Sequence, residues 1–206
     1  MATIRERNKR LIIKTACQVF ADKGFAATKT SDIADQAGLP KANIYYYFKS
    51  KEALYRAVLE SIIDPLLQAY SSFHSEHEPA RALEAYIKAK IRISREHADA
   101  SKVFASEIMH GAPHLSSGSL EQLKAEAERS IERIRQWIEE GLMAPVDPHH
   151  LMFTIWASTQ TYADFDWQII QITGRRKLTA KDYDSAARLI TDLVLKGCEV
   201  QKAEDT

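Results

Sequence analysis

Apolar residues recur at intervals of three and four along almost the whole chain, which is the spacing of one face of an α-helix. Alternating apolar and polar residues bounded by hairpin turns, the pattern typical of half-buried strands, are missing. The pattern therefore predicts an all-α fold. In the first helix Ile13, Ala16 and Phe20 lie on one stripe, and Gly24 is expected to end it because glycine readily adopts the left-handed conformation.

Capping residues predict where the next helices begin and end. Thr30 is placed to cap a short helix that runs through Ala37 and ends at Gly38. A third helix follows after only a few residues. Ser50 is placed to cap a fourth helix that reaches about Phe73 and links the N-terminal head to the rest of the chain.

The remaining two thirds of the chain also show helical spacing. Asp147 is an N-cap candidate for a helix that is apolar on more than one face and so needs two partners. A Ser/Gly loop is expected over 114–119, and a mobile segment around Gly174 is expected before the last helix. The predicted helices span residues 80–97, 98–110, 120–138, 149–167 and 180–200.

Charge is unevenly distributed, although 28 basic and 28 acidic residues cancel overall. Residues 1–56 contain 11 Lys and Arg against 5 Asp and Glu, a net charge of +6, which leaves 17 against 23, or −6, for residues 57–206. A basic head suits a polyanionic partner. Such asymmetry also arises by chance in soluble proteins, so charge alone supports nucleic-acid binding only modestly.

Several other classes of protein are disfavoured. No apolar run is long enough for a membrane span and the N-terminus is charged, so we expect a cytoplasmic protein with no membrane partner. Cys17 and Cys198 lie in apolar helical patterns and are expected to be reduced core residues.

The chain also lacks a convincing catalytic constellation. His110, His114 and the pair His149-His150 do not have the spacing of a closed metal site, and no glycine-rich phosphate loop or nucleophile elbow is present. We therefore predict no catalytic residue, no metal and no cofactor. A helical adaptor that binds only protein is the other alternative, and the charge of the head argues against it.

A helix-turn-helix pattern points to DNA instead. Two short helices, 31–37 and 41–47, are joined by Gly38-Leu39-Pro40, and the second is the candidate recognition helix. Its outward residues combine cations, phenols and one amide, which suit phosphate oxygens and base edges. Three consecutive tyrosines cannot all be buried. For Tyr47 a role in the core is an equal alternative, whereas Tyr45 and Tyr46 favour DNA.

Segments 28–34 and 38–54 resemble the TetR family of one-component regulators. The resemblance implies a three-helix DNA-binding head (1–50) and a regulatory body of about six helices (51–206) that binds a ligand and dimerises. It also implies a homodimer that acts as a repressor on a near-palindromic operator in double-stranded DNA. Pro40 stands where the family commonly has a small hydroxylic residue. The residues predicted to meet DNA are Thr28, Thr30, Lys41, Ala42, Asn43, Tyr45, Tyr46, Tyr47 and Lys51.

Parts of the body, including 144–151 and 155–165, resemble pyrimidine-responsive members of the same family. That resemblance implies that uracil or a related pyrimidine releases the operator. An unrelated hydrophobic or aromatic effector is the alternative. The predicted ligand-binding residues are Trp156, Thr159 and Gln160, which share one helix face, and Glu107 and His110, which lie on another helix.

Other interpretations of these residues stay open. Trp156 could be core, Gln160 could bridge helices in a dimer, and Glu107 with His110 could be a surface pair. The dimer itself is expected to form from the last two long helices, with a stripe of Ile190, Leu193, Val194 and Gly197 on the final one.

Overall fold

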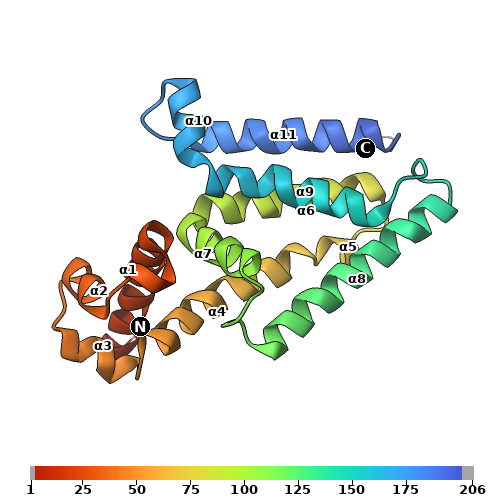
Figure 1. Ribbon diagram of the computed structural model, residues 1–206. Helices are drawn as coiled ribbons and strands as arrows, with labels where there is room; N and C mark the ends of the chain where they lie inside the picture. The colour runs from red at the N-terminus through yellow and green to blue at the C-terminus, as the bar shows by residue number, and fades with distance from the viewer. Residues whose placement is uncertain (1–2, 201–206) are drawn as a thin grey trace. The chain divides into compact units, whose positions relative to one another are not determined.

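The computed structural model describes residues 3–200, and all regular secondary structure in that range is helical (Figure 1). The predicted all-α fold is confirmed. No helix within this range is long and apolar enough to cross a membrane. The helices are α1 (Ile4–Ala27), α2 (Thr30–Ala37), α3 (Lys41–Tyr47), α4 (Lys51–Ala69), α5 (Ser72–Ser75), α6 (Pro79–Glu96), α7 (Ala98–Met109), α8 (Ser117–Glu139), α9 (Pro148–Asp164), α10 (Asp166–Thr173) and α11 (Ala180–Gly197).

The chain forms two compact units, and each contains two stretches of sequence. Unit 1 comprises the chain up to Asp64 together with Asp99–Leu120, and unit 2 comprises Pro65–Ala98 together with the chain from Glu121 onward. Consequently α4 and α8 each belong to both units, and nearly all of α7 belongs with the head. The predicted division at residue 50, between a DNA-binding head and a ligand-binding body, concerns function and not packing. It stays a prediction.

Local capping explains the helix boundaries of unit 1. The hydroxyl of Ser50 accepts a hydrogen bond from the backbone N–H of Ala53 at 3.1 Å, which confirms its predicted capping role. Gly24 has φ 74°, and the chain departs there from regular helix as predicted, although helical hydrogen bonding resumes to Ala27. The cap predicted at Thr30 is wrong, because Thr30 is the first residue of α2 and Lys29 occupies the cap position.

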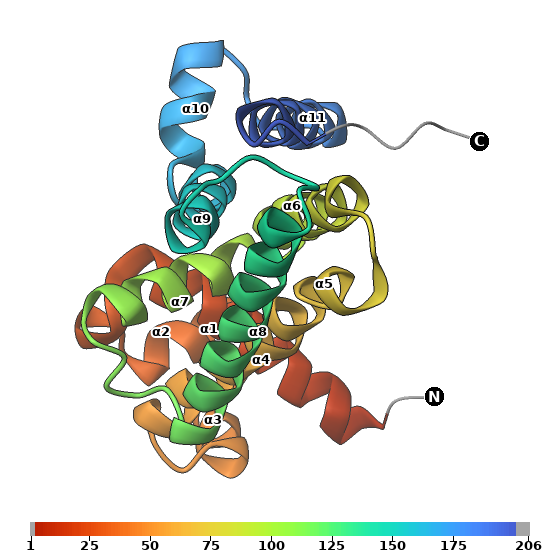
Figure 2. The ribbon, with the colours of Figure 1, turned by 90° about the vertical axis from the view of Figure 1, so that its right-hand side faces the viewer.

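Unit 2 is built around α6, α9 and α11, which pack side by side (Figures 1 and 2). The apolar faces of these helices supply fully buried side chains such as Leu83, Ile87, Met152 and Ile155. Burial of each such side chain contributes about 1.5–3 kcal/mol relative to exposure. Asp147 accepts hydrogen bonds from the backbone N–H groups of His149 and His150, so its predicted role as the cap of α9 is confirmed.

Three predicted boundaries were wrong. The helix expected to run from 149 through 167 ends at Asp164, and α10 follows as a separate helix with no buried side chain, which Figure 2 shows leaving α9 at a steep angle. The helix expected from 120 begins at Ser117, because Ser116 accepts a hydrogen bond from the backbone N–H of Ser119. The helix expected to reach Phe73 ends at Ala69, and the short α5 follows it.

Candidate DNA interface and effector site

The helix-turn-helix is held by a small shared core and a tight turn. Ile33 and Ala34 of α2 and Ile44 of α3 are each at most 1% exposed. Gly38 adopts the left-handed conformation with φ 65°, which glycine reaches without a Cβ clash, and its backbone N–H bonds the carbonyls that end α2. The backbone N–H of Leu39 donates to Ala34 O at 3.0 Å. These contacts fix α3 against α2.

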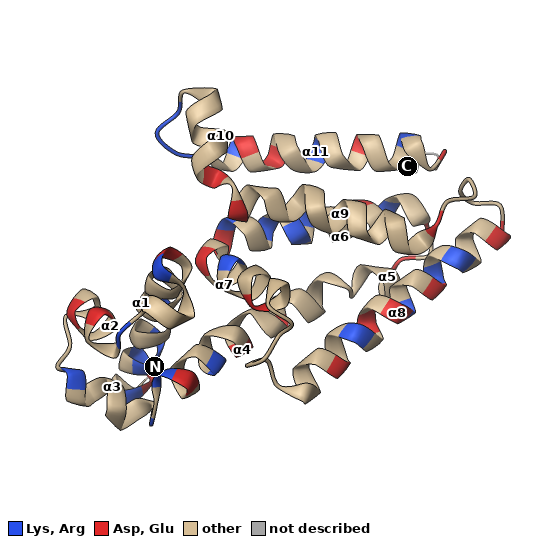
Figure 3. Cartoon of the chain, in the orientation of Figure 1, with Lys and Arg blue, Asp and Glu red and all other residues tan. Residues whose placement is uncertain are grey.

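The outer side of α3 is exposed and carries the residue types predicted there. Tyr46 is 71% exposed and Tyr45 46%, while Asn43 and Tyr47 are half-buried. The Nζ of Lys41 lies 5.8 Å from the centre of the Tyr45 ring, and the rings of Tyr46 and Tyr47 pack edge to face. Figure 3 shows Lys and Arg on both α1 and α3. The face therefore presents the Lys41 ammonium and phenolic hydroxyls on one short helix.

Three of the predicted DNA-binding side chains are engaged inside unit 1. The hydroxyl of Thr28, a residue only 2% exposed, donates to the carbonyl of Gly24 at 2.7 Å, and the hydroxyl of Thr30 lies 3.0 Å from that of Tyr45. The Nζ of Lys51 donates to three carbonyls that follow Gly24, at distances of 2.8, 3.1 and 3.3 Å.

An ammonium group has three N–H donors, so in this conformation Lys51 has none left for a phosphate. The hydroxyl hydrogen of Thr28 is also committed. In this structure both side chains hold the end of α1, and their contact with DNA stays a prediction. The Nζ of Lys51 also lies 4.5 Å from the centre of the Phe25 ring, a favourable cation–π distance.

Glu107, predicted to bind ligand, is the buried centre of a cluster in unit 1. Its carboxylate is 3% exposed and accepts a hydrogen bond from the backbone N–H of His114 at 2.5 Å. It also accepts from the hydroxyl of Tyr55, and burial together with this charge raises the pKa of Tyr55 far above its usual value. The His114 ring packs 4.5 Å from that of Phe25 and 5.2 Å from that of Tyr55.

This cluster ties α7 and the segment after it to α4 and the end of α1. Sequence spacing did not indicate this cluster, because Tyr55 is far from Glu107 in the chain and the ring of His114 packs against the distant Phe25 and Tyr55. The neighbouring His110 is exposed, with its Nδ1 2.7 Å from Ser106 O. Since Glu107 and His110 belong to unit 1 while Trp156, Thr159 and Gln160 belong to unit 2, neither unit brings the five predicted ligand residues together.

The face of α9 predicted to bind ligand packs against α6. The indole N–H of half-buried Trp156 donates to the hydroxyl of Tyr86 at 2.7 Å, and Tyr86 in turn donates to Tyr70. Thr159 is fully buried and its hydroxyl donates to Ile155 O, so it is a core residue. The side-chain amide of Gln160 donates to Asp164 at 2.8 Å.

Lys90 on α6 is a functional candidate that the sequence reasoning missed. It is only 9% exposed, and loss of hydration lowers its pKa to about 8, although the negative charge of Asp164 opposes the change. The available signal was its position among Tyr86, Ile87 and Ile91 on an apolar helix face. Long-chain cations on such faces usually reach water, so the pattern alone did not indicate burial.

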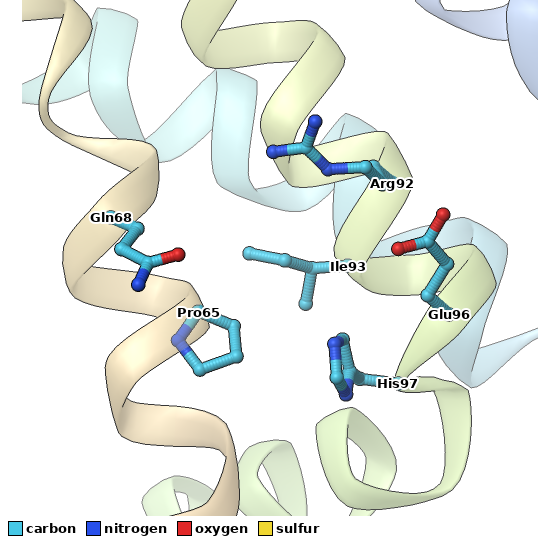
Figure 4. Close-up of a pocket in the computed structure, with 6 residues that line it drawn as sticks. All are labelled: Pro65, Gln68, Arg92, Ile93, Glu96 and His97. Carbon is cyan, nitrogen blue, oxygen red and sulfur yellow. The ribbon is translucent and has the colours of Figure 1, made fainter.

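A separate surface pocket of about 360 Å³ lies within unit 2 (Figure 4). The side chains from α4 face those from α6 across it, and most of the polar ones are exposed. It contains none of the predicted ligand residues. Its lining consists of Pro65, Gln68, Arg92, Ile93, Glu96 and His97.

The residues that the structure describes were compared with the requirements of a metal site and of a reactive cysteine, and they meet neither. Within residues 3–200 no group of three or more His, Cys, Asp or Glu side chains is placed to hold a metal ion. Cys17 and Cys198 are both buried and unpaired. Burial raises the pKa of Cys17 to about 11, which disfavours the reactive thiolate.

A rigid helix-turn-helix with a basic and aromatic recognition helix, in an all-helical chain, defines a DNA-binding transcriptional regulator. Residues 12–58 match the model of bacterial regulatory proteins of the tetR family, and residues 59–201 match that of the C-terminal region of YcdC-like proteins. The chain therefore belongs to the TetR family and is a transcriptional regulator, not an enzyme.

Individual proteins of known name or structure are similar to this chain over most of its length. The HTH-type transcriptional regulator RutR of Escherichia coli K12 is 38% identical over 189 residues, which cover 92% of this chain and 89% of RutR. The structure of the ketosteroid transcriptional regulator KstR2 of Mycobacterium tuberculosis matches with a TM-score of 0.71 at 22% identity. The match covers 95% of this chain and 96% of the KstR2 chain. The structure of AibR with isovaleryl coenzyme A and operator DNA matches with a TM-score of 0.66 at 19% identity. That match covers 90% of this chain and 97% of the AibR chain. The two structures show a shared fold.

Proposed function

We propose that this regulator is a repressor that binds a near-palindromic operator as a homodimer and leaves it when its body binds a pyrimidine, uracil first. The exposed face of α3 is the observation that carries the DNA-binding part. The likeness of segments 144–151 and 155–165 to pyrimidine-responsive regulators supports the effector.

In the proposed complex α3 enters the major groove. Lys41, Tyr45 and Tyr46 are exposed and hold phosphate oxygens, while Asn43 and the small Ala42 approach base edges. Tyr47 and Thr30 support this face through their contacts with Tyr46 and Tyr45.

Exposed apolar residues on α9 and α11 support the homodimer. Leu189 and Leu193 of α11 are 58% and 63% exposed, and Phe153 of α9 is 47% exposed. Ile190 and Val194, expected in the dimer stripe, are only 7% and 8% exposed because they face the core of unit 2. The interface is therefore assigned to the Leu189 side of α11. Two heads would then meet major grooves about 34–36 Å apart, or a multiple of the helical turn.

Effector binding must act through unequal affinity for two conformations of the dimer, because equal binding to both would shift nothing. We assign the coupling to α4, which begins in unit 1 and continues into unit 2 beyond Asp64. Pro65 lies at this division and lacks a backbone N–H, which weakens the helix there and suits a hinge. A coupling of about 1–3 kcal/mol would loosen DNA several-fold to a hundredfold.

Operator titration tests the proposal. The protein is titrated against genomic fragments at several salt concentrations, and binding should weaken steeply as salt rises because phosphate contacts release counterions. At fixed salt, uracil should then weaken operator binding at least several-fold. Salt-insensitive binding would contradict the DNA interface, whereas operator binding unchanged by uracil, thymine and dihydrouracil would contradict the effector.

A further inference from the structure

The pocket between α4 and α6 borders the points where the chain passes from one unit to the other, although all its lining residues belong to unit 2. Pro65, on the α4 side, is the first residue of unit 2 after Asp64. His97, on the α6 side, is followed by Ala98, the last residue before the chain returns to unit 1. Two of the three passages between the units are therefore next to one pocket.

Both of these passages interrupt regular helix. Pro65 lies inside α4 and has no backbone N–H, so the helical hydrogen bond that this group would donate is missing. His97 separates α6 from α7, and its φ of −126° and ψ of 31° lie outside helical geometry. A ligand that contacts α4 and α6 beside these two residues would therefore bias the direction in which each helix continues into unit 1.

The hydrogen-bond donors of the pocket are not committed to other residues. In the described part of the chain, residues 3–200, no hydrogen bond or ion pair engages the side chains of Gln68, Arg92 or His97. Figure 4 shows Gln68 and Arg92 extending into the space between the two helices, whereas Glu96 points away from α4. The hydrogen bond from Arg95, at 2.6 Å, holds the pKa of Glu96 below its usual value. The pocket thus offers a guanidinium, an amide and an imidazole to a ligand.

The chemistry of this lining selects an organic anion. Ile93, which is 4% exposed, and the ring of Pro65 supply an apolar surface. The volume of about 360 Å³ lies in the range of small-molecule sites. A guanidinium has five N–H donors in a planar fork and no acceptor, which matches the two oxygens of a carboxylate. The lining therefore favours a small organic acid over a neutral or cationic ligand.

We infer that this pocket binds a small organic carboxylate and that its occupation changes the affinity of the protein for operator DNA. Arg92 of α6 holds the carboxylate with two parallel hydrogen bonds. The amide of Gln68 donates to the same group from α4, so that one ligand joins the two helices. The hydrocarbon part of the ligand packs on Ile93. This site is separate from the proposed effector site on α9 and does not depend on a pyrimidine.

Methyl NMR of the full-length protein tests binding with benzoate as the probe. The δ1 methyl signal of Ile93, assigned through Ile93→Val, should shift and saturate at millimolar benzoate, an affinity that a ligand of this size allows. Benzamide has the same ring without the charge and should bind at least about tenfold more weakly. Inorganic phosphate that binds as tightly as benzoate would overturn the assignment to organic acids.

Variants assign the binding to the pocket. Arg92→Gln should weaken benzoate binding by about tenfold or more. Arg81→Gln is the matched control, because Arg81 lies about three turns earlier on α6, outside the pocket, in an exposed ion pair with Glu78. Circular dichroism checks that each variant is folded. Unchanged benzoate affinity in folded Arg92→Gln, or no shift of the Ile93 methyl signal at about 10 mM benzoate, would overturn the inference.

Operator titration tests the regulatory part. At constant ionic strength, saturating benzoate should change the operator affinity of the wild type at least about fivefold and leave that of Arg92→Gln unchanged. Without benzoate the two proteins should bind operator equally, because Arg92 belongs to neither the DNA interface nor the proposed effector site. Uracil is absent throughout, so failure of the pyrimidine effector would not alter this result. Benzoate that binds without changing operator affinity would reject regulation through this pocket.

Discussion

Replacement of Lys90 by methionine should stabilise the folded protein at pH 7. Burial lowers the pKa of Lys90 from 10.5 to about 8. Each tenfold change in an acid dissociation constant corresponds to about 1.4 kcal/mol, so the buried ammonium costs the folded state about 3 kcal/mol. Methionine is unbranched and flexible enough to fill the space of the lysine stem without that charge.

The gain in stability should decrease as the pH rises above 8. Because the pKa of Lys90 is lower in the folded than in the unfolded chain, the unfolded chain binds more protons between pH 8 and 10.5. The buried ammonium destabilises the folded state fully below pH 8, and this destabilisation decreases as the pH rises from 8 towards 10.5. The advantage of Lys90→Met over the wild type should therefore be greatest near pH 7 and shrink towards pH 10.

Urea unfolding followed by circular dichroism measures this effect, at one protein concentration because the proposed dimerisation would contribute to stability. Lys88→Met, an exposed change on the same helix, should alter the free energy of unfolding by no more than about 0.5 kcal/mol. The reasoning is refuted if folded Lys90→Met is no more stable than the wild type at pH 7, or if its advantage is the same at pH 7 and pH 9.5.

Three further substitutions test other parts of the molecule. Tyr46→Ala removes a 71% exposed side chain, so operator affinity in a gel shift should fall several-fold, as expected for about 1 kcal/mol, with an unchanged melting temperature. Lys51→Met removes the donor to three carbonyls and should lower the free energy of unfolding by about 1 kcal/mol, and a drop in operator affinity without any loss of stability would argue for a direct phosphate contact instead. Leu193→Glu places a charge on the proposed interface, so light scattering at micromolar concentration should report half the wild-type mass, and an unchanged mass would exclude that face.

Sequence alone determined the features that depend on neighbours only a few residues apart. Helical spacing predicted the all-α fold, and the caps at Ser50 and Asp147 and the turn at Gly38 were predictable because each acts through backbone groups within five positions. The outward residues of the recognition helix were predictable for the same reason, since one short helix has to bury only one side.

Tertiary structure alone decided which polar side chains are committed inside the protein. Lys51 caps α1 from 23 or more positions away, Glu107 holds Tyr55 and His114, and Tyr86 receives Trp156 across 70 positions. The burial of Lys90 likewise depends on how α6 packs against α9. A helical period specifies which residues share a face, whereas the hydration and the partners of that face depend on the helices that cover it.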